Sequence, residues 1–196
     1  MTQQGSAVQA LIPFLDAIHG SHRVIAERGG HGGHRSLDAW IQGPGAGLRK
    51  VPDIVLENFD GAQSFLLIDV KTFDAAGLTH LLTCHTDRVR LAAHRYVTKR
   101  AVEEEYGALP ARMRLVVLPI STFGAIGTPG HTFIGELSRR MRASVPYSLL
   151  PHASWATPRV SPMIRMALTH AVRRGLAASV HANWRCGDGG SGGGAE

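Results

Sequence analysis

Two aspartates and a lysine lie close together in the segment KVPDIVLENFDGAQSFLLIDVKTF, residues 50–73. Asp53 and Asp69 each stand eight positions from Gly61, and Asp60-Gly61-Ala62 favours a hairpin turn between two strands. In such a hairpin the two aspartates face each other, with Cβ atoms about 4.5–5.5 Å apart. Two carboxylates this close repel each other unless a cation lies between them. Carboxylate oxygens are the ligands that Mg²⁺ takes, so the spacing predicts a magnesium site with Mn²⁺ as a substitute.

Lys71 completes this group, because it is two residues beyond Asp69 and therefore points to the same face of the strand. The alternate residues Ile68 and Val70 are expected to face the core. Two metal ligands beside an ammonium group suit metal-assisted hydrolysis of a phosphodiester. The same residues also fit the solvated face of an ordinary strand, and the sequence leaves that alternative open.

The elements that must position these residues follow an α/β order. We expect helices over 7–27, 87–106, 128–142 and 162–184, and strands over 53–59, 64–73 and 114–118. Thr128 is the expected N-cap of its helix with Pro129 at the first helical position, and Gly107 follows the end of another helix. Pro119 is expected to end the strand that precedes it.

The hairpin resembles the catalytic segment of the PD-(D/E)xK nuclease superfamily, which has the restriction-endonuclease-like fold. Pro52-Asp53 matches the PD element, and Asp69-Val70-Lys71 matches the (D/E)xK element. The resemblance implies an αβββαβ core, a mixed central sheet flanked by helices, with C-terminal helices added. It assigns magnesium binding to Asp53 and Asp69 and assistance in hydrolysis to Lys71. It also requires an early strand, assigned to residues 40–50, and offers Glu27 as an acidic ligand from the first helical region.

A second resemblance covers residues 50–180 and rests on three short segments. RVRLAAHRYVTKR, RLVVLPISTFGAIG and MIRMALTHAVRRGLAASV are similar to the endonuclease portion of retrotransposon polyproteins. This implies an endodeoxyribonuclease that works with a reverse transcriptase in the same or a related polypeptide. It also implies a nuclear location for a eukaryotic element, and a cytoplasmic one otherwise. Two alternatives stay open: a non-cleaving nucleic-acid-binding module and an inactive retroelement fragment, both with the same fold.

The charge of the chain agrees with a polyanionic partner such as DNA. Lys and Arg number 21 against 15 Asp and Glu, which gives a formal net charge of +6 and a pI near 10.0. Arg88, Arg95 and Lys99 recur on one stripe of an expected helix, where they would contact DNA phosphates. The acidic run at 103–105 follows directly, so an ordinary solvated face is the competing interpretation.

Histidine is frequent, at 11 residues, and four of them lie close together in the first part of the chain. His19, His22, His31 and His34 would be able to hold zinc, although glycines around the last two favour solvated side chains. Two cysteines exclude a disulfide scaffold and a four-cysteine zinc site.

Length and composition predict a single domain over residues 1–186 and a disordered glycine-rich tail over 187–196. With 44% hydrophobic residues the chain can bury a core, and it has no run of about 18 apolar residues that would span a membrane. No signal-peptide pattern is present, so we expect an intracellular protein. The broad apolar side of the last helix suits core packing and is compatible with a homodimer.

Overall fold

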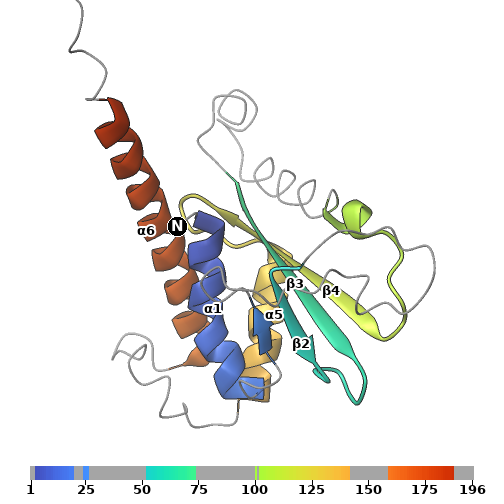
Figure 1. The fold of residues 1–196 in the computed structure, drawn as a ribbon. Coiled ribbons are helices and arrows are strands. Elements are labelled where there is room, and N and C mark those ends of the chain that lie inside the picture. Colours follow the sequence, from blue (N-terminus) through green and yellow to red (C-terminus); the bar gives the residue numbers. More distant parts are fainter. Residues whose placement is uncertain are drawn as a thin grey trace, which may run out of the picture.

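The structure is a computed structural model that describes residues 3–19, 24–26, 52–73, 100, 102–141 and 159–187. These residues form a mixed α/β fold with a four-stranded sheet in the order β1-β2-β3-β4 (Figure 1). Along the chain the labelled elements are α1 (Gln3–His19), β1 (Val24–Ala26), β2 (Ile54–Glu57), β3 (Phe65–Phe73), β4 (Met113–Ser121), α5 (Thr128–Arg140) and α6 (Val160–Gly187). Residues 102–106 are also helical and precede β4.

The sheet combines antiparallel and parallel pairing. β1 pairs with β2 and β2 with β3 in antiparallel fashion, whereas β3 and β4 run parallel. β2 and β3 form the expected hairpin, in which Ile54 lies opposite Ile68 and Glu57 opposite Phe65. Every partner pair is therefore symmetric about Gly61, which adopts φ 131° in the turn. This confirms the predicted register.

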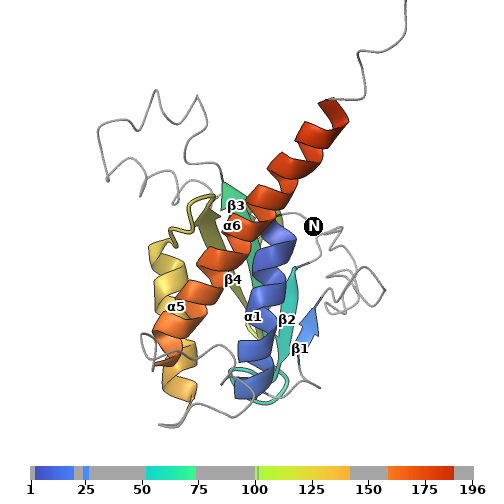
Figure 2. The ribbon, with the colours of Figure 1, turned by 90° about the vertical axis from the view of Figure 1, so that its left-hand side faces the viewer.

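Helices α1, α5 and α6 cover one face of the sheet, as Figure 2 shows. The larger core cluster lies between this helical layer and the sheet, and it includes Ile68 and Val70, both fully buried as predicted. A smaller cluster lies on the other face of the sheet, where Tyr106 packs with Leu67 and Val117. The alternation of β3 side chains thus serves two cores, because both faces are covered.

The two ends of the sheet carry different groups. Figures 1 and 2 both place the end of β3, the turn after β4 and the start of α1 at one end of the molecule. The turn of the β2–β3 hairpin and the last turn of α5 lie at the other end. The C-terminal half of α6 extends beyond the sheet at the first of these ends.

The first helix is shorter than predicted, because it ends at His19 and not at residue 27. Gly20 follows His19 in the sequence, and Val24 and Ile25 are β-branched residues that favour a strand. They form β1, in which Val24 pairs with Leu56. The first strand of the sheet is therefore at 24–26, while the region assigned to it, 40–50, lies outside the described residues.

Three further boundaries differ from the prediction. β4 continues through Pro119 to Ser121, which is possible because β4 is at the edge of the described sheet and need not donate a hydrogen bond on its outer side. The N-cap of α5 is Gly127, and Thr128 is already helical. α6 includes Gly187, the first residue of the predicted tail, and 188–196 lie outside the described residues.

The end of the predicted helix 87–106 is confirmed, whereas 87–99 lie outside the described residues. Gly107 has φ 62° and donates its N–H to the carbonyl oxygen of Glu103 at 3.1 Å. This left-handed conformation after the last turn is the glycine C-cap that the sequence predicted.

Candidate functional site

Asp53, Asp69 and Lys71 meet at one end of the β2–β3 hairpin, and we call these three residues the carboxylate site. Asp53 directly precedes β2, where the register continued by one residue sets it opposite Asp69. Lys71 Nζ lies 3.1 Å from Asp69 Oδ1. The sequence therefore predicted both the meeting of these residues and the register that produces it.

Asp53 is held by groups from two different elements. Its Oδ2 accepts the backbone N–H of Val70 at 2.7 Å, just beyond the last residue pair of β2 and β3. The Gln4 side-chain amide donates to Oδ1 and Oδ2, at 3.0 and 3.1 Å. Gln4 lies in the first turn of α1, so the helix also turns its positive end toward this carboxylate.

Burial raises the pKa of Asp53 above its ordinary value of 3.8, and the negative charge of Asp69 raises it further. The Val70 N–H, the Gln4 amide and the Lys71 ammonium act in the opposite direction without cancelling these effects. The negative charges of the two carboxylates therefore repel each other in the folded protein, as their predicted closeness implies.

Asp69 is the most deeply buried acid of the site, with 1% of its surface exposed. Its Oδ2 accepts the hydroxyl of Tyr106 at 3.0 Å. Among the residues that the structure describes, no donor meets Oδ1 with hydrogen-bond geometry, although Lys71 Nζ lies near it as an ion pair. A buried carboxylate oxygen without a hydrogen bond is costly for a protein unless a ligand completes it.

Tyr106 is fully buried beneath Asp69. Burial, the charge of Asp69 and the hydrogen bond to it all raise the pKa of Tyr106, so its hydroxyl stays protonated and donates. Sequence analysis missed Tyr106 and Gln4, because neither residue has a spacing that links it to the hairpin. The end of a predicted helix at Gly107 was the one signal that placed an aromatic near β4.

The donor set of the carboxylate site fits a magnesium ion. Mg²⁺ is commonly bound by one or two carboxylates, with waters and substrate phosphates completing its shell. Two mutually repelling carboxylates, one with a buried oxygen that accepts no hydrogen bond, provide such a pair. Within the described ranges no group of three His, Cys, Asp or Glu side chains gathers at one point, so this site offers two protein ligands.

Several predicted residues lie outside the described part of the chain. These are the candidate ligand Glu27, the phosphate contacts Arg88, Arg95 and Lys99, and three of the four histidines, His22, His31 and His34. The fourth, His19, packs its ring edge-on against Phe59 and its Nε2 contacts the carbonyl oxygen of Glu57. These contacts give His19 a packing role at the far end of α1.

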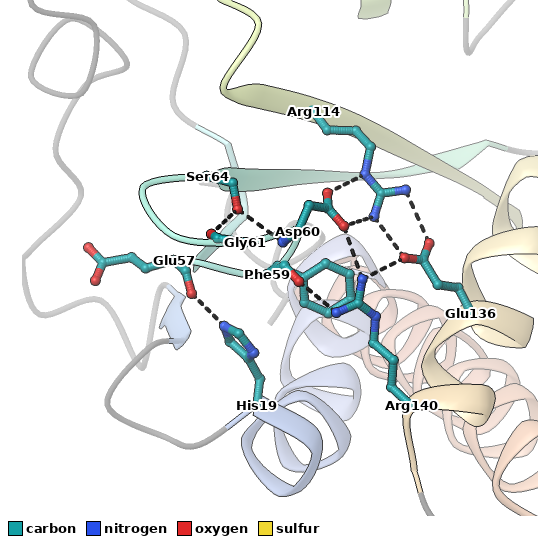
Figure 3. A network of polar contacts seen from close by, with 9 residues as sticks. All are labelled: His19, Glu57, Phe59, Asp60, Gly61, Ser64, Arg114, Glu136 and Arg140. Atoms are coloured by element: carbon teal, nitrogen blue, oxygen red, sulfur yellow. Dashed lines mark hydrogen bonds and ion pairs between the residues drawn. The ribbon is translucent and has the colours of Figure 1, made fainter.

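A second polar group, the arginine cluster, consists of Asp60, Arg114, Glu136 and Arg140 at the turn end of the hairpin (Figure 3). Arg114 donates to Asp60 Oδ2 at 2.8 Å and to both oxygens of Glu136 at 3.0 and 3.1 Å. Arg140 donates to Asp60 Oδ1 at 3.0 Å and lies 3.7 Å above the Phe59 ring. All four carboxylate oxygens accept hydrogen bonds, so this cluster is complete without a ligand.

A groove of about 790 Å³ lies between α1 and α6, and it is lined by residues that include Ala10, Met163, Met166 and Ala171. None of its lining residues is Asp, Glu or Lys, so it lacks the groups needed for the chemistry predicted for the hairpin. The carboxylate site is therefore the candidate functional centre.

No helix in the described part of the chain is long and apolar enough to cross a membrane. No protein-family model, curated protein or solved structure shows significant similarity to the chain. The functional inference therefore rests on the geometry of the site.

Proposed function

We propose that this protein is a magnesium-dependent endonuclease that hydrolyses phosphodiester bonds of DNA, with Mn²⁺ as an alternative metal. The observation that carries the proposal is the buried Asp69 Oδ1, which accepts no hydrogen bond from the described residues and lies beside Lys71 and the facing Asp53. Lys71 Nζ lies 3.1 Å from this oxygen without hydrogen-bond geometry, so a metal ion would complete its coordination.

The order of the elements supports a restriction-endonuclease-like core. One helix, three antiparallel strands, a helical segment and a parallel strand follow one another as αβββαβ, and α5 and α6 come after them. Asp53 directly precedes the second strand of this order, and Asp69 and Lys71 stand on the third, as the PD-(D/E)xK resemblance expects. Gln4 of α1 reaches Asp53 from the first helix, where a glutamate was expected.

Each residue of the site has a role in this mechanism. Asp53 and Asp69 would hold the ion, and Tyr106 fixes Asp69 by binding its other oxygen. Bound Mg²⁺ would lower the pKa of a water and stabilise negative charge on the phosphate. Lys71, with 29% of its side chain exposed, is positioned to offset charge that develops on the phosphate oxygens.

Nicking of supercoiled plasmid in Mg²⁺ or Mn²⁺ tests the proposal. We expect nicking by the native protein, none in EDTA, and a loss of about 100-fold or more in Asp69→Ala, because the metal contributes several kcal/mol to the transition state. Asp53→Asn is the second variant, since it keeps an acceptor for Val70 and removes the charge together with one of the two oxygens that accept from Gln4. Glu104→Ala, an exposed acid paired only with Arg100 in the described residues, is the matched control.

Three results would contradict the proposal. Full activity in Asp53→Asn would show that the carboxylate pair holds no catalytic ion. Nicking that survives EDTA would point to a contaminating or metal-free activity. Binding of plasmid without turnover in any divalent ion would favour the non-cleaving nucleic-acid-binding module.

A further inference from the structure

The turn after β4 exposes an aromatic side chain at the same end of the molecule as the carboxylate site. Phe123 has 56% of its surface exposed, more than the other large apolar residues that stand out from the described surface, Met166 and Val180 on α6. A single exposed apolar side chain is common on protein surfaces, so the significance of Phe123 depends on what surrounds it.

The backbone of this turn is held firmly on both sides. Thr122 donates its N–H to the carbonyl oxygen of Phe73 at 2.9 Å, which ties the turn to the end of β3. From α6, the Thr169 hydroxyl donates to the carbonyl oxygen of Gly124 at 3.1 Å, and Arg173 donates to that of Phe123 at 3.4 Å. Gly124 has φ 83°, and a Cβ there would lie 2.4 Å from Thr169 Cγ2, so only glycine fits.

The helix beside Phe123 is strongly basic. Residues 159–187 contain five arginines and no Asp or Glu, against a net charge of +6 for the whole chain. Arg173, which contacts the turn, is exposed, whereas the exposed Arg174 lines the groove between α1 and α6. The C-terminal half of α6 extends past the sheet at this end (Figures 1 and 2). The surface around Phe123 is therefore complementary to a polyanion.

Phe123 lies at the same end of the sheet as the candidate metal site, although α6, which holds its turn, covers the face opposite to that of Asp69 and Tyr106. Phe73 pairs with Ser121 across the parallel strands, Lys71 is two residues before Phe73, and Phe123 is two residues after Ser121. At about 3.3 Å per residue and about 4.8 Å between strands, the Cα atoms of Lys71 and Phe123 are roughly 10–15 Å apart. A strand whose bases stay stacked at about 3.4 Å each would cover that separation with about three or four nucleotides.

We propose that Phe123 and Arg173 form a platform that binds a single-stranded stretch of nucleic acid at the same end of the sheet as the carboxylate site. The ring stacks on an unpaired base, since every base has a face that an aromatic can cover, and Arg173 binds a neighbouring phosphate. This inference rests on the proposed nuclease function and adds its substrate class: DNA with unpaired bases a few nucleotides from the scissile phosphate.

Fluorescence anisotropy with a labelled single strand and the matched duplex, both in EDTA, measures this binding without cleavage. We expect Phe123→Ala to weaken single-strand binding about tenfold and duplex binding less than twofold, while Phe123→Trp retains single-strand affinity. Arg173→Ala should reduce the slope of log affinity against log salt. Met166→Ala and Arg139→Ala, an exposed apolar and an exposed basic residue elsewhere, are the matched controls and should leave both affinities unchanged.

The outcomes separate this proposal from the nuclease proposal. Unchanged single-strand affinity in Phe123→Ala, or an equal loss in Met166→Ala, would overturn the platform even if the protein nicks plasmid. Binding to anionic vesicles with none to oligonucleotides would assign the basic helix to a membrane surface and would also overturn it. Single-strand binding that depends on Phe123, in a protein that never cleaves, would support the platform and reject only the nuclease.

Discussion

The two ends of the β2–β3 hairpin carry charged groups that are satisfied in opposite ways. At the turn end, the arginine cluster joins two arginines to two carboxylates, and every carboxylate oxygen accepts a hydrogen bond. At the other end, the carboxylate site has two acids and one lysine, and Asp69 Oδ1 accepts no hydrogen bond from the described residues.

The pKa values of Glu136 and Asp53, one acid at each end, are shifted in opposite directions. Burial acts to raise the pKa of Glu136, but the hydrogen bonds and charges of Arg114 and Arg140 outweigh it and the pKa is lowered. For Asp53, burial and Asp69 prevail and the pKa is raised. The fold therefore stabilises the charge of Glu136 and destabilises that of Asp53.

The largest expected effect on stability comes from neutralising an acid of the arginine cluster. Glu136→Gln removes the charge that binds both arginines, and we expect it to lower the free energy of unfolding by about 1–2 kcal/mol. Denaturant unfolding at pH 7 measures the change, with Glu104→Gln as a control for an exposed ion pair. A loss no greater than that of the control would mean that the cluster contributes little to stability.

Neutralising an acid of the carboxylate site should change the free energy of unfolding in the opposite direction. Asp53→Asn removes a charge that the fold disfavours and keeps an acceptor for the Val70 N–H, so we expect a gain of up to about 1 kcal/mol in EDTA. The same unfolding experiment checks it. If Asp53→Asn is less stable than the native protein, the fold does not disfavour the charge of Asp53, and the contrast with Glu136 is wrong.

The pH dependence of stability tests the same comparison through a smaller effect. The folded pKa of Glu136 lies below its ordinary value of 4.5, so the stability that its charge contributes is complete above about pH 4.5 and is lost as pH falls through the lowered pKa. The stability difference between native protein and Glu136→Gln should thus stay constant from pH 7 to about pH 5 and then shrink. A difference that instead grows toward low pH would contradict the assigned direction.

The hairpin and its two aspartates were predictable because the relevant information is local. The symmetry about Gly61 sets the register, and the alternation of Ile68, Asp69 and Val70 sets the face to which each side chain points. Both features lie within one segment of the chain, and the structure reproduces them.

The partners of these residues depend on tertiary contacts, which explains why sequence reasoning missed them. Gln4 is 49 residues from Asp53, and Tyr106 is 37 residues from Asp69. No local sequence pattern links residues that are so far apart in the chain. Sequence reasoning missed strand β1 for a similar reason. Its three residues form a strand because they pair with β2, which is a tertiary contact.

The arginine cluster had no signal in the sequence either. Arg114 and Arg140 are 54 and 80 residues from Asp60, and only the close spacing of Glu136 and Arg140 within α5 is local. Both arginines count toward the net charge of +6, but the fold pairs them with Asp60 and Glu136. The unpaired basic charge is therefore better sought on α6, which contains no acid.

Thermal unfolding with and without Mg²⁺, for the native protein, Asp53→Asn and Glu136→Gln, tests the central claim most directly. A metal that binds only the folded state should raise the midpoint of the native protein and of Glu136→Gln by an amount worth about 1–3 kcal/mol, and leave Asp53→Asn unchanged. An equal rise in Asp53→Asn, or no rise in the native protein, would contradict the assignment of Asp53 and Asp69 as metal ligands.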